Sequence, residues 1–309
     1  MKYAIVFPGQ GSQSLGMLSD LFSNFSIVKD IFSEASDALD LDLWKLVQED
    51  EDVLNQTENT QPAMLAAGYA TYKVLSNEID LSPICMAGHS LGEYTALVAA
   101  NSLNFFEAVK LVRKRAELMQ SAVPSGTGAM AAILGLDDEK VIEICNQSNI
   151  LGVVEAVNFN SPGQVVIAGE KGAVNSVCKA MKNAGAKRAL VLPVSVPSHC
   201  SLMASVANKF ADSVDMVNFK IGNVDVLHNV DASYANDANE IKLKLVEQLC
   251  KPVLWTSSVQ KMQQLGVEKL IELGPGKVLA GLARRIDKSL SSLAVIDTAA
   301  VQSTIEEIS

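Results

Sequence analysis

Short apolar runs alternate along the chain with longer segments of helical periodicity. Residues 3–7 and 84–87 are apolar runs with the length of buried strands, and apolar positions recur with helical spacing over 26–41, 61–75 and 103–122. Strands that alternate with helices indicate a parallel sheet covered by helices on both faces. The pattern therefore predicts an α/β fold.

A different rhythm begins at residues 124–128, where Pro-Ser-Gly-Thr-Gly interrupts any regular element. The pattern that follows predicts strand, helix, strand, strand, helix and strand, which is the order of a ferredoxin-like unit. These predicted elements cover 129–136, 137–148, 153–159, 164–168, 173–183 and 188–196. We therefore predict a ferredoxin-like small domain of residues 125–196, inserted into a large catalytic α/β domain of residues 1–124 and 197–309.

The alternation of strands and helices resumes after Pro197. A helix is expected to begin near residue 199, and two further strands and three further helices follow. We place the strands at 224–228 and 269–273 and the helices at 238–250, 255–265 and 278–286. This return to the earlier rhythm favours one parallel-sheet core built from both ends of the chain.

The composition suits a large buried core in a chain of 309 residues. Hydrophobic residues make up 49% and charged residues 19%, a balance typical of folded domains. The 25 basic and 35 acidic residues leave a net charge of −10, which argues against general nucleic-acid binding because that requires basic contacts to phosphates. Any acidic partner must then dock on a local basic patch.

Cysteine usage and hydropathy point to the cytoplasm. The five cysteines are odd in number, widely spaced and without a C-x-x-C pair, which is the usage of a reducing compartment. The apolar start ends at Pro8, too early for a signal peptide, and no stretch approaches the roughly 20 apolar residues of a membrane span. We expect a cytoplasmic monomer without a membrane or nucleic-acid partner and without a metal or other cofactor.

Residues 88–92, Gly-His-Ser-Leu-Gly, fit the nucleophile-elbow pattern G-x-S-x-G. An apolar strand precedes the motif and a helix to about residue 100 follows it, which is the context that an elbow needs. Glycine two residues to either side removes side chains that would collide in so tight a turn. We predict that Ser90 is a nucleophile; the alternative is a structural, glycine-lined turn.

A serine hydroxyl needs a general base, and the chain has three histidines. His89 adjoins Ser90, and neighbouring side chains in a sharp turn point apart. His228 lies in a strand pattern, where a structural histidine is the simpler interpretation. His199 stands at the predicted junction of the two domains, where clefts form, so it is the candidate base. No Asp or Glu is marked out as an orienting group, and Cys200 beside the candidate base leaves a redox role as a minor alternative.

Arg115 falls on the apolar face of the helix predicted over 103–122. Each residue advances by about 100° around a helix, which places Arg115 among the apolar side chains and Lys114 on the opposite side. A guanidinium keeps its proton, so a core-facing arginine needs an anionic partner. One interpretation is a buried salt bridge with a protein carboxylate. The other is a two-pronged hydrogen bond to the carboxylate of a substrate.

Residues 9–13, Gly-Gln-Gly-Ser-Gln, follow the first strand and suit a close approach of backbone to ligand. The loop lacks the third glycine of a dinucleotide fingerprint and the lysine of a P-loop. In elbow enzymes the oxyanion hole uses the N–H that follows the nucleophile, here that of Leu91, and a second N–H from another loop. We expect Gln10 to supply the second donor.

With these motifs in view, the chain resembles the malonyl-CoA:acyl-carrier-protein transacylases of bacterial fatty-acid synthesis, nearly from end to end. The resemblance is carried by segments 7–13, 60–63, 88–94, 126–130, 160–164, 196–199, 247–249 and 274–279, and by Arg115 ahead of Met119 and Gln120. It implies an α/β-hydrolase-like parallel-sheet core with a ferredoxin-like insertion.

The resemblance also implies roles for individual residues. Ser90 would carry the acyl group, and His199 would act first as general base and then as general acid. Arg115 would pair with the malonyl carboxylate, and the backbone N–H groups of Gln10 and Leu91 would form the oxyanion hole.

Three supporting positions and two partners complete the expectation. By resemblance, the backbone carbonyl of Gln248 would orient the base, and Gln61 and Asn160 would line the cleft. The implied partners are malonyl-CoA and phosphopantetheinylated acyl-carrier protein. They would exchange the malonyl group through a malonyl-serine, in a ping-pong mechanism.

Two other functions are compatible with the elbow. A serine thioesterase or esterase would use the same nucleophile, but it would normally bring a triad acid and has no need of a core-facing arginine. A catalytically silent scaffold that binds acyl-carrier protein is the second alternative, and it would carry no acyl group on Ser90.

Overall fold

A five-stranded parallel sheet lies at the centre of the larger part of the molecule. Its strand order is β7-β2-β1-β8-β9, and every neighbouring pair is parallel. The strands are β1 (Tyr3–Phe7), β2 (Met86–Gly88), β7 (Val226–Leu227), β8 (Lys269–Leu273) and β9 (Ser291–Val295). The predicted α/β fold with a parallel core is confirmed in this computed structural model, which describes residues 1–194 and 196–308.

Side chains alternate along β1 between two apolar cores. Ile5 and Phe7 pack into the core on one face of the sheet, whereas Ala4 and Val6 pack into the core on the other. The first face carries α2 (Ser26–Leu39), α5 (Thr57–Glu78), α6 (Gly92–Ala99) and α7 (Phe105–Ser121), and the second carries α12 (Trp255–Gln264) and α13 (Val278–Ile286). Because both faces are covered, β1 is buried along its whole length, which explains its continuous apolar run.

The remaining helices of this part extend the first core. They are α1 (Ser19–Asn24), α3 (Leu43–Glu49), α4 (Glu51–Leu54), α10 (Ala204–Asp215), α11 (Ala238–Glu247) and α14 (Thr298–Ile308). Within residues 1–194 and 196–308, no helix is both long enough and apolar enough to cross a membrane.

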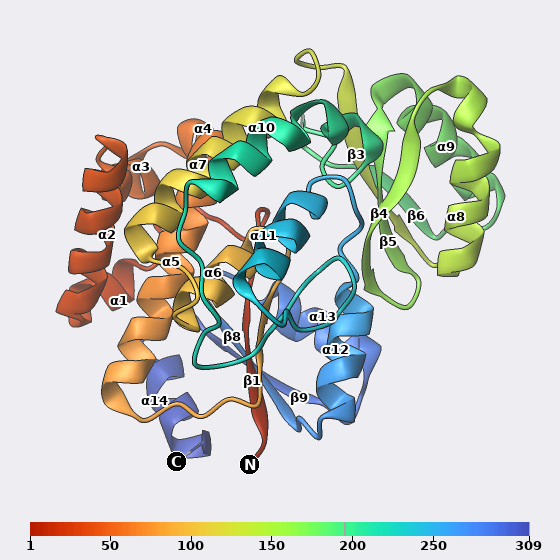
Figure 1. Ribbon diagram of the computed structural model, residues 1–309. Helices are drawn as coiled ribbons and strands as arrows, with labels where there is room; N and C mark the ends of the chain where they lie inside the picture. The colour runs from red at the N-terminus through yellow and green to blue at the C-terminus, as the bar shows by residue number, and fades with distance from the viewer. Residues whose placement is uncertain (195, 309) are drawn as a thin grey trace.

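A second, antiparallel sheet lies at one end of the molecule, with two helices packed on it (Figure 1). Its strand order is β4-β5-β3-β6. The elements are β3 (Gly128–Leu134), α8 (Asp138–Gln147), a short 3-10 helix (Asn149–Leu151), β4 (Val154–Ser161), β5 (Gln164–Glu170), α9 (Lys171–Asn183) and β6 (Arg188–Val191). This order confirms the predicted βαββαβ unit. That the two sheets belong to domains divided at 124/125 and 196/197 stays a prediction.

Several parts of the chain differ from the predicted elements, and helices α1, α3 and α4 were not predicted at all. Strand β6 ends at Val191, not at 196, and residue 195 lies outside the described residues. No helix begins at His199; a turn there leads into a 3-10 helix (Ser201–Met203) and then into α10. The pattern also misses β9 and α14, because β9 is a half-exposed edge strand without a continuous apolar run.

The carboxyl ends of β1 and β2 bring two loops together. Phe7 pairs in register with Gly88, so the loop after β1 and the turn after β2 meet at the same edge of the sheet. Ligands of open parallel sheets bind at this edge. The fold thereby joins the two glycine-containing motifs of the sequence into one place.

Candidate active site

Ser90 lies in the sharp turn between β2 and α6, with its backbone in the left-handed region at φ 52°. The turn leaves no room for side chains at the flanking glycines. A Cβ on Gly88 would lie 1.8 Å from the backbone carbon of Gly92, and one on Gly92 would lie 2.1 Å from the carbonyl oxygen of Phe7. The need for glycine on both sides therefore has a steric cause, and the strained turn exposes Ser90 to a cavity.

His199 meets Ser90 although 109 residues separate them along the chain. Its Nε2 lies 2.8 Å from Oγ of Ser90, and its Nδ1 lies 2.6 Å from the backbone carbonyl oxygen of Gln248. A carbonyl oxygen only accepts hydrogen bonds, so Nδ1 carries the proton and Nε2 is free to accept the proton of Ser90. The predicted nucleophile and the predicted base are thus at hydrogen-bond distance.

Burial and a nearby cation keep the imidazole of His199 neutral. Desolvation, together with the positive charge of Arg115, lowers its pKa from 6.5 to about 3. The backbone of His199 is also left-handed, at φ 66°, just ahead of the 3-10 helix. Strained backbones at both hydrogen-bonded residues indicate that the surrounding fold holds them in place.

The other two histidines and Cys200 have different surroundings. Nε2 of His89 lies 2.8 Å from Oδ1 of Asn160, on the small sheet. His228 is buried just after β7, and its Nδ1 donates to a carboxylate oxygen of Glu93 at 2.7 Å. Desolvation raises the pKa of the Cys200 thiol to about 12, which removes the reactive thiolate that redox chemistry requires.

Arg115 is 1% exposed on α7 and reaches the nucleophile. Its two terminal nitrogens donate to Oε1 of Gln61 and to Oε1 of Gln248, each at 2.9 Å, and one of them lies 3.4 Å from Oγ of Ser90. Within residues 1–194 and 196–308, no carboxylate lies within ion-pair distance of this guanidinium, and its Nε has no hydrogen-bond partner. The alternative of a direct salt bridge is therefore wrong, and a buried cation borders the cavity.

The backbone N–H groups of Gln10 and Leu91 have no hydrogen-bond partner in the part of the chain that the structure describes. Both residues line the cavity beside Ser90. Leu91 stands at the N-terminus of α6, where helical N–H groups are left unpaired, and Nε2 of Gln10 ties its loop to Oγ1 of Thr57 at 3.2 Å. The arrangement fits the expected oxyanion hole, and that role stays a prediction.

A layer of buried polar side chains lies beneath the elbow, and the sequence analysis missed most of it. Oδ1 of Asn229 accepts the N–H of Ser90 at 2.7 Å, and its Nδ2 donates to a backbone carbonyl of the same turn. Glu93 accepts from Nδ1 of His228 and from Nε2 of Gln248 at 2.7 and 2.8 Å. We call Glu93, His228, Asn229 and Gln248 the elbow floor. The spacing of one helical turn between Ser90 and Glu93 is the one sequence signal for it.

The cavity above Ser90 measures about 260 Å³, and its walls come from loops and helices of the larger part and from strands β3, β4 and β5 of the small sheet. All but one of the predicted site residues line it, namely Gln10, Gln61, Ser90, Leu91, Arg115, Asn160 and His199. Gln248, the exception, lies beneath it and contacts three of them. Asn158 on β4 also lines the cavity without having been predicted, and its Oδ1 has no partner among the described residues. The described residues include no group of three His, Cys, Asp or Glu placed to hold a metal ion.

Comparison with known proteins agrees with this fold. A family model described as an acyl transferase domain matches residues 4–302. A malonyl CoA-acyl carrier protein transacylase of Haemophilus influenzae is 52% identical over 307 residues, which are 99% of this chain and 98% of the relative.

Solved structures of similar proteins superpose closely on this chain. A malonyl-transacylase in complex with its type II PKS acyl-carrier protein has a TM-score of 0.98 and 50% identity, covering 99% of this chain and 100% of that chain. An acyl carrier protein S-malonyltransferase from Vibrio cholerae has a TM-score of 0.96 and 52% identity, covering 98% of this chain and 100% of that chain. The chain therefore belongs to the acyl transferase family, in its group of malonyl CoA-acyl carrier protein transacylases.

Proposed function

We propose that this chain transfers a malonyl group from malonyl-CoA to the phosphopantetheine thiol of acyl-carrier protein, as a step of fatty-acid biosynthesis. The observation that carries the proposal is Arg115, a buried guanidinium that has no carboxylate partner among the described residues and lies 3.4 Å from Oγ of Ser90. The malonyl carboxylate is one methylene away from the thioester carbonyl. A carbonyl placed at Ser90 therefore brings a carboxylate within reach of Arg115, whereas a neutral acyl group would leave the cation unpaired.

In the first half-reaction, Ser90 is acylated by malonyl-CoA. Nε2 of His199 takes the hydroxyl proton while Oγ attacks the thioester carbonyl carbon. The tetrahedral oxyanion is held by the N–H groups of Gln10 and Leu91, which have no other partner among the described residues. The carbon–sulfur bond then breaks, Nε2 returns its proton to the departing thiolate, and free coenzyme A leaves a malonyl ester on Ser90.

The second half-reaction repeats these steps with a new thiol. The phosphopantetheine thiol gives its proton to Nε2 of His199 and attacks the malonyl ester, and the oxyanion forms at the same two N–H groups. The carbon–oxygen bond breaks, Ser90 recovers its proton, and the malonyl thioester of the carrier protein departs. Two half-reactions at one nucleophile predict ping-pong kinetics.

The arrangement of the base favours transfer by a dyad over a triad with an acid. Nδ1 of His199 donates to a neutral carbonyl of Gln248, and the nearby buried carboxylate of Glu93 is bonded to His228 instead. The fixed tautomer is thus obtained without a carboxylate beside the base. This supports the transacylase over a serine hydrolase with a Ser-His-acid triad.

The exposed surface of α13 carries basic residues at both of its ends, and we assign the anionic arms of both substrates to this surface. Coenzyme A and the phosphopantetheine arm carry phosphates, and this helix borders the cavity through Val278, Leu279 and Leu282. Four basic residues are exposed on it or next to it: Lys277, Arg284, Arg285 and Lys288. In a chain with a net charge of −10, this is a local patch of the kind that an anionic partner requires.

The test is to trap the acyl-enzyme. Incubation with labelled malonyl-CoA, acid quench and peptide mass spectrometry should place a malonyl ester on Ser90. Carrier protein bearing phosphopantetheine should discharge this ester, while carrier protein without the arm, as the matched control, should not. Free malonate as the main product would favour the thioesterase, and absence of label on Ser90 would favour the silent scaffold.

A further inference from the structure

Two carboxylates are buried among the described residues, and their charges are compensated in different ways. Glu272 on β8 accepts the N–H groups of Leu279 and Ala280 at 3.1 and 2.8 Å, so the N-terminus of α13 balances it. Glu93, 0% exposed in the first turn of α6, accepts from His228 and Gln248 side chains and from the backbone N–H of Asn229. No lysine or arginine contacts Glu93 directly within residues 1–194 and 196–308.

The side-chain amide of Gln248 connects Glu93 to Arg115. Its Nε2 donates to Oε2 of Glu93 at 2.8 Å, and its Oε1 accepts from Arg115 at 2.9 Å. A carboxylate only accepts and a guanidinium only donates, so the amide has one possible orientation. An anion and a cation thus face each other across a single neutral amide.

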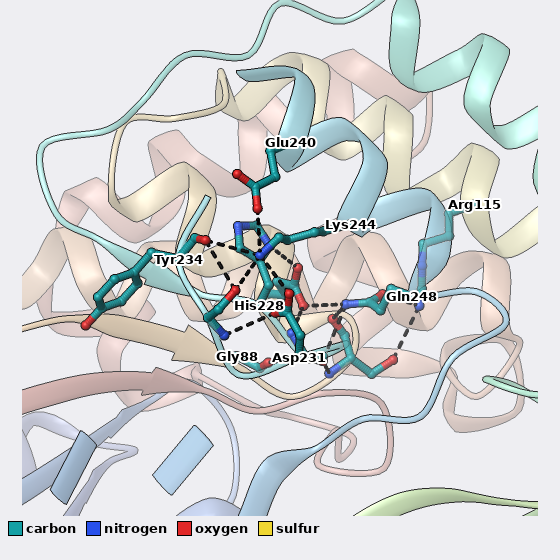
Figure 2. Close-up of polar contacts among 12 residues, drawn as sticks. Gly88, Arg115, His228, Asp231, Tyr234, Glu240, Lys244 and Gln248 are labelled. Atoms are coloured by element: carbon teal, nitrogen blue, oxygen red, sulfur yellow. Dashed lines mark hydrogen bonds and ion pairs between the residues drawn. The ribbon is translucent and has the colours of Figure 1, made fainter. Parts of the chain in front are cut away.

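The next buried cation along this network is already paired elsewhere. Figure 2 shows Arg115 and Gln248 at one end of the chain of polar contacts and Lys244 with Glu240 at the other. Nζ of Lys244 lies 2.9 Å from Oδ2 of Asp231 and 3.2 Å from Oε1 of Glu240. Lys244 therefore has carboxylates of its own, and Arg115 is the buried cation left to balance the floor.

Among the described residues, Arg115 touches only neutral groups: the amides of Gln61 and Gln248, the hydroxyl of Ser90 and the ring of Tyr94. Burial lowers the pKa of this guanidinium, and nearby Tyr94 and then Glu93 act in the opposite direction and support the cation. A direct ion pair would occupy the donors that a substrate carboxylate needs. The amide of Gln248 accepts from one terminal nitrogen of Arg115 only, which leaves further N–H groups of the guanidinium for a substrate carboxylate.

We propose that Glu93 is a positioning residue that sets how tightly Arg115 holds an acyl carboxylate. Its charge balances the guanidinium through the oriented amide of Gln248, without a direct ion pair. The balance weakens the grip of Arg115 on the malonyl group, which suits an enzyme that must release this group to a second thiol. This inference rests on the proposed function, in which Arg115 receives the malonyl carboxylate.

The test uses Glu93→Gln in a Ser90→Ala background, which cannot be acylated. Gln keeps the shape of Glu, and its amide can donate to His228 in the other tautomer, so the variant removes mainly the charge. Calorimetric titration should show malonyl-CoA bound about three- to tenfold more tightly, because a unit charge is lost one amide away from the cation. Acetyl-CoA should bind within about twofold of the parent protein, since it brings no carboxylate.

The direction of the change in malonyl-CoA affinity distinguishes this role of Glu93 from a purely structural one. If the substitution only loosened the packing of the elbow floor, the variant would bind malonyl-CoA more weakly. Unchanged or weaker binding therefore overturns the inference. Glu272→Gln is the matched control for loss of a buried carboxylate, and it should leave the ratio of malonyl-CoA to acetyl-CoA affinity unchanged. If the parent Ser90→Ala protein shows no preference for malonyl-CoA, the proposed function fails instead.

A thermal stability cycle covers the case in which Glu93→Gln alone does not fold. Arg115→Met should lower Tm, because it leaves the buried charge of Glu93 without a nearby cation. Adding Glu93→Gln should restore half of the lost Tm or more. A single variant that fails to fold while the double variant folds supports the same coupling. Additive losses, or failure of both, would mean that Glu93 serves the fold without regard to Arg115.

Discussion

The elbow floor differs from the wall of the active-site cavity in how its polar groups are hydrogen-bonded. The wall is the set of residues that line the cavity, Arg115 and Asn158 among them. In the floor, Glu93, Asn229 and Gln248 each make two or more hydrogen bonds beneath the elbow. In the wall, Nε of Arg115 and Oδ1 of Asn158 have no partner among the described residues. Unpaired buried polar groups cost free energy. The paired groups of the elbow floor therefore hold the elbow rigid, whereas the unpaired groups of the wall are available to bind a ligand.

The largest effect should come from the residue that joins floor and wall, His199. Its ring is held by the carbonyl of Gln248 and faces Oγ of Ser90. We expect His199→Ala to slow acylation of Ser90 by about 10³–10⁴-fold, because the hydroxyl loses its general base. Quenched-flow mass spectrometry of the acyl-enzyme measures the rate. Retention of activity within about tenfold would remove His199 from the role of base.

The second effect tests the wall through Arg115. Arg115→Met keeps the apolar packing of α7 and removes the group that pairs with the carboxylate. We expect malonyl-CoA acylation to fall by about 10²–10³-fold, the loss typical of one partner of a buried charge pair. Acetyl-CoA acylation should survive or improve. An equal loss with both substrates would show that Arg115 serves the structure of the site and not its selectivity.

The third effect compares an asparagine of the floor with one of the wall. Asn229→Ala leaves the N–H of Ser90 buried without its acceptor, so the free energy of unfolding should fall by about 1–3 kcal/mol. Acylation by malonyl-CoA and by acetyl-CoA should fall alike. Asn158→Ala, the matched wall variant, should change the free energy of unfolding by less than about 0.5 kcal/mol. Urea denaturation measures both, and equal destabilisation would erase the distinction between floor and wall.

The smallest effect concerns pH. With a pKa of about 3, His199 is already neutral well below pH 7, so acylation should not decline between about pH 8 and pH 5. Arg115→Met removes one of the three influences that lower this pKa, so the acid limb of the pH–rate profile should move to higher pH. It should stay below 6.5, since burial remains. Acetyl-CoA acylation rates across this range test the shift, and a wild-type midpoint near 6.5 would contradict it.

The local pattern of apolar and polar residues predicted most of the fold and part of the site. Strands β1 and β8 and helix α13 begin and end where the apolar pattern places them, because each is bounded by turn residues or by a change of period. The burial of Arg115 also followed from the angular position of residues on a single helix. Strand β9 was not predicted because it lies at the edge of the sheet and most of its residues are half-exposed, so it has no continuous apolar run.

The local pattern could not predict which distant residues these side chains contact. The sequence marks Glu93 only as a residue of the elbow motif, and nothing local shows that it accepts from His228, which is 135 positions away. Likewise Asn229 meets Ser90 across 139 positions. Such contacts depend on β7 lying next to β2 in the sheet, which strand spacing does not reveal.

By itself, the sequence determined which residues could do chemistry: a serine in a glycine-flanked turn and an arginine on an apolar helical face. Periodicity and steric limits act within a few residues, so they are legible in a single chain. The tertiary structure decided what each of them faces. It placed a carbonyl of Gln248, and not a carboxylate, behind His199, and it left Arg115 without an ion pair among the residues that the structure describes. These arrangements arise only when distant segments pack around one cavity.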